Sequence, residues 1–68
     1  MTQREFIKKV NSLAKKDMTI AQGWIDCYNR DHGTEYSFLN KRVVFKFTAH
    51  GKTEWHDALV WATDESIF

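Results

Sequence analysis

The chain has 68 residues, a formal net charge of +1, one cysteine and no proline. A chain this short forms one domain, residues 1–68, and buries only about 60% of the surface that its unfolded form exposes. Cys27 has no second cysteine to pair with, so an intramolecular disulfide is excluded and a reducing cytoplasm is the expected compartment. No apolar run approaches the ~20 residues that span a bilayer, and residues 1–16 lack the apolar stretch of a signal peptide, so we expect no contact with a membrane.

Residues 2–16 are predicted to form an amphipathic helix. Thr2 and Glu5 have the spacing of a capping box, in which each side chain accepts a hydrogen bond from the other residue's backbone N–H. Apolar residues then recur at helical spacing, which predicts one buried stripe. This stripe consists of Phe6, Ile7, Val10, Leu13 and Ala14.

A second helix is predicted from about residue 19 to residue 32. Thr19 and Gln22 repeat the capping-box spacing, and Gly33 suits the left-handed residue that ends many helices. Gly23 inside a helix costs roughly 1 kcal/mol relative to Ala, so we expect it to pack closely against a neighbour. The apolar stripe of this helix consists of Ala21, Trp24, Ile25 and Tyr28.

From residue 34 onward the composition changes to β-branched and aromatic residues, which favour strands. Strands are predicted at residues 35–39, 42–49 and 53–62, with turns at Asn40-Lys41 and His50-Gly51-Lys52. The expected fold is therefore α+β (ααβββ), with two N-terminal helices packed on one face of a small three-stranded antiparallel meander.

The segment 53–62 fits two structures. Trp55, Ala58, Leu59 and Ala62 have a spacing that suits a helix. A strand with a bulge near His56-Asp57 is the favoured interpretation, because the preceding turn is hairpin-like and Val60-Trp61 suits a sheet.

Alternation along the hairpin predicts which sheet face is buried. Counted straight through the turn, the odd-numbered residues Val43, Phe45, Phe47, Leu59 and Trp61 face the helices. Two short helices cover only one face, so the other face is expected to be exposed and to bind a protein. This face shows Val44, Thr48, His56, Ala58 and Val60 between Arg42 and Lys46, and its candidate contact residues are Val44, His56, Ala58 and Val60. The alternative is that polar side chains and the tail residues Ile67 and Phe68 cover this face.

Charge is unevenly distributed despite the small net charge. Residues 1–16 contain five basic residues and one acidic residue, whereas residues 54–65 contain acidic residues and no Lys or Arg. The two segments are expected either to attract each other within the fold or to form two oppositely charged surfaces. Further candidates for contact with a target are Glu54, Asp57, Asp64 and Glu65.

Catalytic, cofactor-binding and metal-binding residues are not predicted. Cys27, His32, His50 and His56 lack the paired spacing of zinc ligands, and Cys27 is expected to be a half-buried, unreactive thiol. His56 and Asp57 are adjacent, so in a strand they point to opposite faces and are poorly placed to act as an acid–base pair. The glycines are isolated and form no phosphate-binding loop.

These observations predict a non-enzymatic protein-interaction module that binds another protein or a second copy of itself. In size and chemistry the chain resembles the small accessory and inhibitor proteins of phages and mobile elements, although no motif matches. This resemblance implies a steric mechanism, in which the chain occupies a surface that its target needs.

The alternative is a small nucleic-acid-binding domain. Winged-helix proteins also place two helices before a hairpin, and residues 42–47 interleave basic and aromatic residues as an RNA-recognition strand does. Asp26 and Asp31 in the second helix argue against groove reading, because duplex nucleic acid carries dense negative charge. The basic residues that would contact phosphates are Lys8, Lys9, Lys15, Lys16, Lys41, Arg42 and Lys46.

Overall fold

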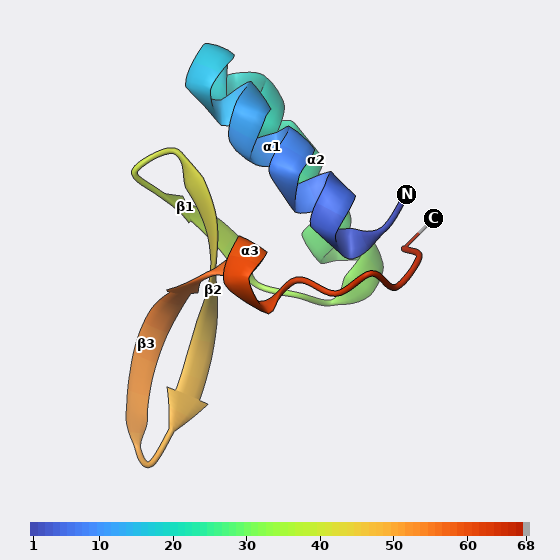
Figure 1. Ribbon diagram of the computed structural model, residues 1–68. Helices are drawn as coiled ribbons and strands as arrows, with labels where there is room; N and C mark the ends of the chain where they lie inside the picture. The colour runs from blue at the N-terminus through green and yellow to red at the C-terminus, as the bar shows by residue number, and fades with distance from the viewer. Residues whose placement is uncertain (68) are drawn as a thin grey trace.

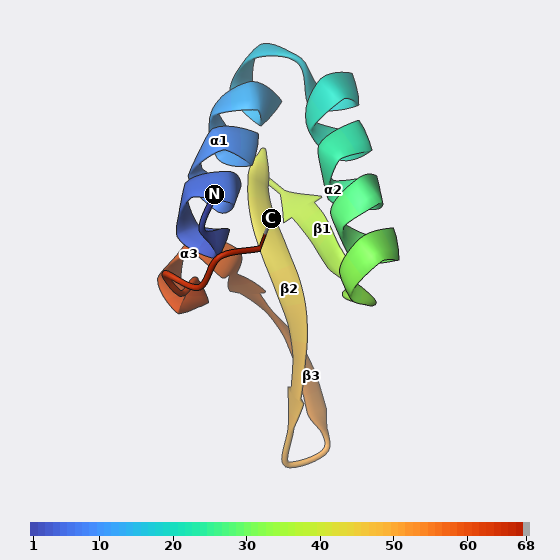
Figure 2. The ribbon, with the colours of Figure 1, turned by 90° about the vertical axis from the view of Figure 1, so that its right-hand side faces the viewer.

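The computed structural model describes residues 1–67 and consists of two helices, a three-stranded antiparallel sheet and a short third helix (Figure 1). Figures 1 and 2 together show that α1 and α2 lie side by side on one side of the sheet. The predicted ααβββ arrangement is therefore confirmed. The elements are α1 (Gln3–Lys16), α2 (Met18–His32), β1 (Tyr36–Leu39), β2 (Arg42–Ala49), β3 (Lys52–Asp57) and α3 (Ala58–Trp61).

The helix ends follow local sequence signals. The capping box of α1 is confirmed, because Thr2 Oγ1 accepts a 3.2 Å hydrogen bond from Glu5 N and Glu5 Oε1 accepts a 3.1 Å bond from Thr2 N. The cap predicted at Thr19 is wrong. Asp17 caps α2, since its Oδ1 accepts from Thr19 N at 3.0 Å and a carboxylate also favours the positive end of the helix dipole. Gly33 ends α2 with φ of 66°, as predicted.

Both turns of the sheet have two residues with positive φ. Asn40 and Lys41 (φ 51° and 63°) join the paired residues Leu39 and Arg42, and His50 and Gly51 (φ 52° and 76°) join the strands β2 and β3. Two positive φ values in a two-residue loop are typical of a type I′ turn, whose twist matches that of the strands.

The second turn sets the register of the hairpin β2–β3. Because the loop has two residues rather than the three predicted, odd positions of β2 pair with even positions of β3. Phe45 therefore lies opposite His56, while Trp55 lies opposite Lys46 on the other face. The assignment of His56 to the face of Val44 was wrong, because a shift of one residue exchanges the two faces of a strand.

The strand predicted to end at residue 62 ends at Asp57 instead. The Asp57 side chain accepts a 2.9 Å hydrogen bond from Leu59 N and caps α3, since Asp favours a helix N-cap over a strand interior. The helical turn points Ala58 into the core and leaves Val60 exposed. The expected exposure of Ala58 was therefore wrong, whereas that of Val60 is confirmed.

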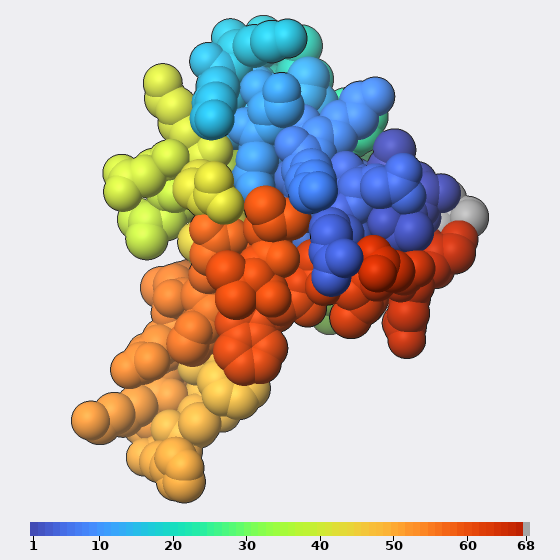
Figure 3. Space-filling view, viewed as in Figure 1, coloured from blue at the N-terminus to red at the C-terminus, as the bar shows by residue number. Residues whose placement is uncertain are grey.

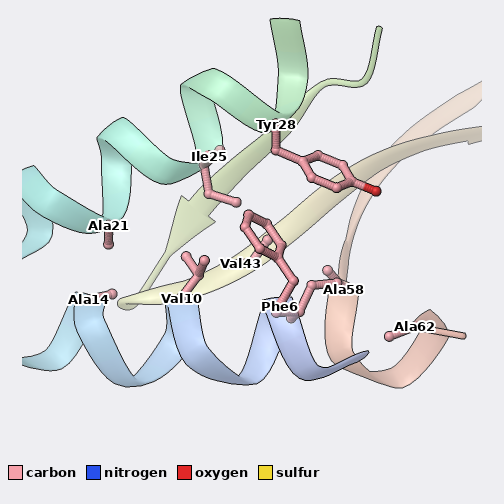
Figure 4. Packing of buried hydrophobic residues seen from close by; sticks show 10 residues of the cluster. Phe6, Val10, Ala14, Ala21, Ile25, Tyr28, Val43, Ala58 and Ala62 are labelled. Carbon is pink, nitrogen blue, oxygen red and sulfur yellow. The ribbon is translucent and has the colours of Figure 1, made fainter. Parts of the chain in front are cut away.

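The core lies between α1, α2 and the first half of β2 (Figure 4). The Phe6 ring stacks on Tyr28 with centroids 4.9 Å apart and on Trp24 with centroids 6.1 Å apart. Val44 is also buried, although it lies on the sheet face opposite Val43, so its expected exposure was wrong. The buried cluster consists of Phe6, Ile7, Val10, Ala14, Ala21, Ile25, Tyr28, Val43, Ala58 and Ala62.

One buried polar side chain links α1 to the sheet. Asn11 Oδ1 accepts a 2.7 Å hydrogen bond from Val43 N. The strand β3 does not reach this position, because its last pair with β2 is Asp57 with Val44. Asn11 thus takes the place of a strand partner, and the Val43 N–H does not remain unsatisfied in the core.

The segment after α3 returns to the beginning of α1. The backbone N–H groups of Gln3 and Arg4 donate 3.0 Å hydrogen bonds to the carbonyls of Glu65 and Thr63, and Arg4 Nη1 lies 3.0 Å from Asp64 Oδ1. Of the two alternatives for the charged segments, attraction within the fold is found at this one ion pair, while the four lysines of α1 are exposed. Ile67 packs against the core cluster rather than across the sheet, and Phe68 lies outside the described residues.

Candidate functional site

Four rings gather on one face of the hairpin and on α3. The rings of Phe47 and Trp61 stack with centroids 6.3 Å apart and an interplanar angle of 18°. The His56 ring lies 5.7 Å from Phe47 and 5.9 Å from Trp61, and Phe45 meets Trp61 edge-on at 6.1 Å. We call Phe45, Phe47, His56 and Trp61 the hairpin aromatic cluster.

Each ring of the hairpin aromatic cluster is placed by a local feature. Phe45 and Phe47 are two apart on β2 and share a face, and the two-residue turn brings His56 of β3 onto the same face. Asp57 then ends β3 and starts α3, which turns Trp61 back over the strands. The cluster therefore depends on the turn register and on the Asp57 cap.

The outer part of the cluster is exposed. In Figure 3 the distal half of the hairpin projects beyond the helices and α3 as an arm. Phe47 and Trp61 are each about half exposed, and together with Glu54 and His56 they line a shallow hollow of about 480 Å³. Exposed aromatic side chains on a projecting element are typical of protein-binding surfaces.

The candidate contact residues do not form one surface. His56 is half-buried inside the hairpin aromatic cluster, Val60 is exposed on α3, and Glu54 is exposed on β3 beside Phe47. Asp64 and Glu65 lie instead in the segment next to α1, where Asp64 is bound to Arg4. Val44 and Ala58 are buried, so neither contributes to a surface.

Sequence reasoning missed Phe47 and Trp61 as surface residues and assigned both to the core. Counting alternation with a two-residue turn would have grouped Phe47 with Glu54, a charged neighbour that indicates a solvent-facing position. No comparable signal existed for Trp61, since its position depends on the short helix α3.

Asp57 holds the hairpin and α3 together. Arg42 Nε donates a 2.7 Å hydrogen bond to Asp57 Oδ2, and Leu59 N donates to the other oxygen. The pKa of Asp57 is lowered, first by the hydrogen bond from Arg42 and further by the bond from Leu59 N, although partial burial opposes them. The pKa of Arg42 is raised by the same pair.

This ion pair predicts an acid-dependent stability. A carboxyl group whose folded pKa is lowered stabilises the fold above its unfolded pKa of about 3.9, and the contribution is lost as the pH falls through the folded pKa. We expect Asp57→Asn to reduce the free energy of unfolding at pH 7, because it removes the charge that binds Arg42. The loss should be only about 1 kcal/mol, since both side chains are partly exposed to solvent. The difference from the parent should shrink below about pH 4, as measured by urea denaturation at several pH values.

Arg42→Gln provides the matched control for this prediction, because it removes the donor and keeps the carboxylate. It should reduce the same pH-dependent contribution, and the double variant should lose little more than either single variant. A pH-independent difference between the parent and Asp57→Asn would contradict the assignment.

The basic residues of the nucleic-acid alternative come from separate places. Lys8, Lys9, Lys15 and Lys16 are exposed on α1, where the Lys9 ammonium group lies 5.4 Å from the centroid of the Trp24 ring. Lys41 lies in the first turn, Lys46 lies opposite Trp55 on β2, and Arg42 is bound to Asp57. The structure therefore divides these residues between α1, the first turn and β2.

A second hollow, of about 440 Å³, lies along α1 and α2 and is lined by Phe6, Gly23, Trp24, Cys27, Tyr28 and Asp31. A Cβ atom added to Gly23 would meet no atom within 4 Å, so the predicted close packing of Gly23 is wrong. Cys27 is exposed rather than half-buried.

Within residues 1–67, no three His, Cys, Asp or Glu side chains lie together in a way that holds a metal ion. None of the helices in this same part of the chain has the length and apolar character needed to cross a membrane.

Comparison with known proteins found no matching family model, no matching curated protein and no matching solved structure.

Proposed function

We propose that this chain is a non-enzymatic protein-binding domain that contacts its target with the hairpin β2–β3 and α3. The observation that carries the proposal is the exposed stack of Phe47 and Trp61 on a hairpin that projects from the core. Large aromatic side chains supply much of the energy of protein interfaces, because they bury a large area at a small cost in conformational entropy.

The surroundings of the stack also suit a protein target. Lys52 and Glu54 border Phe47 and His56 in the hollow, so an apolar centre is bordered by charges of both signs. Protein interfaces have this organisation, with an apolar centre and a polar rim. A nucleic-acid surface would instead need an excess of positive charge along the contact.

The mechanism we propose is steric. The hairpin occupies a surface of the target and thereby excludes the target's other ligands. Such a mechanism requires no catalytic group, and it depends on the rigid presentation of Phe47 and Trp61 by the turn and by the Asp57 cap.

The proposal is tested by photo-cross-linking in an extract of the source cells. Replacing Phe47 with benzoylphenylalanine should give a discrete covalent adduct with one protein, which mass spectrometry identifies. The same group at Ile20, which lies on α2 and has nearly the same exposure (49% against 47%), should give no such adduct. An adduct from position 20 and none from position 47 would contradict the proposal.

Binding to the identified target then gives a quantitative test. Phe47→Ala and Trp61→Ala should each weaken binding at least about tenfold. The matched controls Ile20→Ala and Leu39→Ala, which truncate equally exposed apolar side chains away from the cluster, should change binding less than about twofold. Equal binding by the parent and by both aromatic variants would overturn the proposed function.

A further inference from the structure

The outer edge of β3 is open. The strand order is β1-β2-β3, and no segment of residues 1–67 pairs with β3 on the side away from β2. The other edge strand, β1, has only four residues and packs beside α2, whereas β3 has six and pairs with β2 without a bulge.

Proteins usually protect such edges with proline, a bulge, a covering segment or charged side chains, lysine above all. The chain contains no proline, and the only lysine of β3 is Lys52 at its first position. The middle of the strand consists of Thr53, Glu54, Trp55 and His56, so Glu54 is the one acidic side chain there. This edge is therefore competent to pair with another strand.

The hairpin geometry determines which backbone groups face this edge. In a two-residue hairpin the residues flanking the loop, here Ala49 and Lys52, hydrogen-bond to each other, and bonded pairs then alternate. Lys52, Glu54 and His56 thus bond to β2. The N–H and C=O groups of Thr53 and Trp55 point outward, whereas Asp57 ends the strand and its C=O accepts the first hydrogen bond of α3.

We infer that β3 pairs antiparallel with β3 of a second copy of this chain, around a twofold axis that passes next to Trp55. The inference goes beyond the proposed function, because it concerns the open edge of the hairpin and not the exposed stack of Phe47 and Trp61. A twofold axis perpendicular to the sheet relates the two strands, so residues that face each other lie on the same face.

The charges of β3 favour the register centred on Trp55 over the register centred on Glu54. With the axis at Trp55, the two Trp55 residues exchange both of their backbone hydrogen bonds, and the C=O of Thr53 in each copy accepts from the N–H of Asp57 in the other. Glu54 of each copy then lies opposite His56 of the other. Within one chain His56 Nε2 already lies 3.9 Å from Glu54 Oε2, and in the dimer the imidazole N–H donates to the carboxylate of the other copy instead. Moving the axis by one residue, to Glu54, places the two Glu54 carboxylates opposite each other, which is destabilising.

The Trp55-centred register also creates a direct aromatic pair. Trp55 is half exposed in the single chain and would lie opposite its own copy. Cross-strand aromatic pairs stabilise antiparallel sheets, so burial of the two indoles adds to the backbone hydrogen bonds.

Pairing in this way has a consequence for the target-binding surface. Because the axis is perpendicular to the sheet, the hairpin aromatic clusters of both copies lie on the same face of one continuous sheet. The dimer thus presents two copies of the Phe47–Trp61 stack to one target or to a symmetric target, and the second contact benefits from a raised effective concentration.

Sedimentation equilibrium of the full chain tests the inference. The parent should show a monomer–dimer equilibrium, and Trp55→Lys and Glu54→Lys should each raise the dimer dissociation constant at least about tenfold. Both substituted side chains are exposed in the single chain, and circular dichroism should show that both variants remain folded. A parent that stays monomeric up to roughly 1 mM, or variants that dimerise as the parent does, would overturn the inference.

Disulfide trapping tests the register. In a Cys27→Ser background, Trp55→Cys should form a disulfide-linked dimer on mild oxidation, because directly paired Cα atoms lie about 5.5 Å apart. Glu54→Cys should not, and neither should Ile20→Cys on α2. A linked dimer from Glu54→Cys and none from Trp55→Cys would contradict the Trp55-centred register.

Failure of this inference is distinguishable from failure of the proposed function. Phe47→Ala should lose the target and keep the dimer, because Phe47 lies on β2 and away from the open edge. A monomeric parent that still cross-links to one target from position 47 would mean that the edge of β3 is free to pair with a strand of that target. Such a result would overturn the dimer alone.

Discussion

Phe6→Ala should lower the free energy of unfolding by about 3–5 kcal/mol, as truncation of a buried aromatic side chain usually does. Phe6 is almost fully buried, and its ring stacks on both Tyr28 and Trp24. Removing it leaves a cavity between α1 and α2. This cavity would be open to water through the adjacent hollow, which is lined by Gly23 and Cys27. A domain of 68 residues has little stability in excess of this amount, so we expect a large unfolded population at 25 °C.

Urea denaturation followed by tryptophan fluorescence measures this loss. Phe47→Ala is the matched control, because it removes the same side chain from an exposed position and should cost less than about 1 kcal/mol. Equal losses from the two variants would contradict the assignment of Phe6 to the core and of Phe47 to the surface.

Val44→Asp should abolish cooperative folding, whereas Val60→Asp should leave the fold intact. Val44 is 6% exposed and Val60 is 78% exposed. A carboxylate at position 44 would be buried directly opposite Asp57, whose charge is already bound by Arg42. Burial of an uncompensated charge beside a like charge costs several kcal/mol, and we expect at least about 3 kcal/mol here.

Thermal melts followed by far-ultraviolet circular dichroism separate the two variants. Val60→Asp should melt within a few degrees of the parent, because surface substitutions usually change stability by less than about 0.5 kcal/mol. Val44→Asp should lack a cooperative transition. A cooperative Val44→Asp melt near that of the parent would contradict the burial of Val44.

The two long helices and the ααβββ order were readable from the chain because their signals are local. The Thr2–Glu5 capping box, the apolar stripe of α1 and the αL residue Gly33 each depend on residues within one or two turns. The change to β-branched and aromatic residues after residue 34 likewise marks the sheet without reference to distant contacts.

The assignment of sheet faces depended on the tertiary structure. Loop length differs by only one residue between the predicted and the observed turn, yet this residue moves His56 onto the face of Phe45 and Trp55 onto the opposite face. The period of a strand is two, so a local pattern with an error of one residue inverts every assignment beyond the turn.

The candidate site was out of reach of the sequence for a related reason. Alternation correctly identified Phe45 and Phe47 as neighbours on one face, but the helices cover only the first half of β2, so Phe47 remains exposed. An aspartate can stand at the end of a strand or at the N-cap of a helix. The hydrogen bonds that Asp57 accepts from Arg42 and from Leu59 N select the helix cap. How far a helix covers a strand, and which of two local conformations an aspartate adopts, are decided by contacts between residues distant in the chain, which periodicity and propensity do not encode.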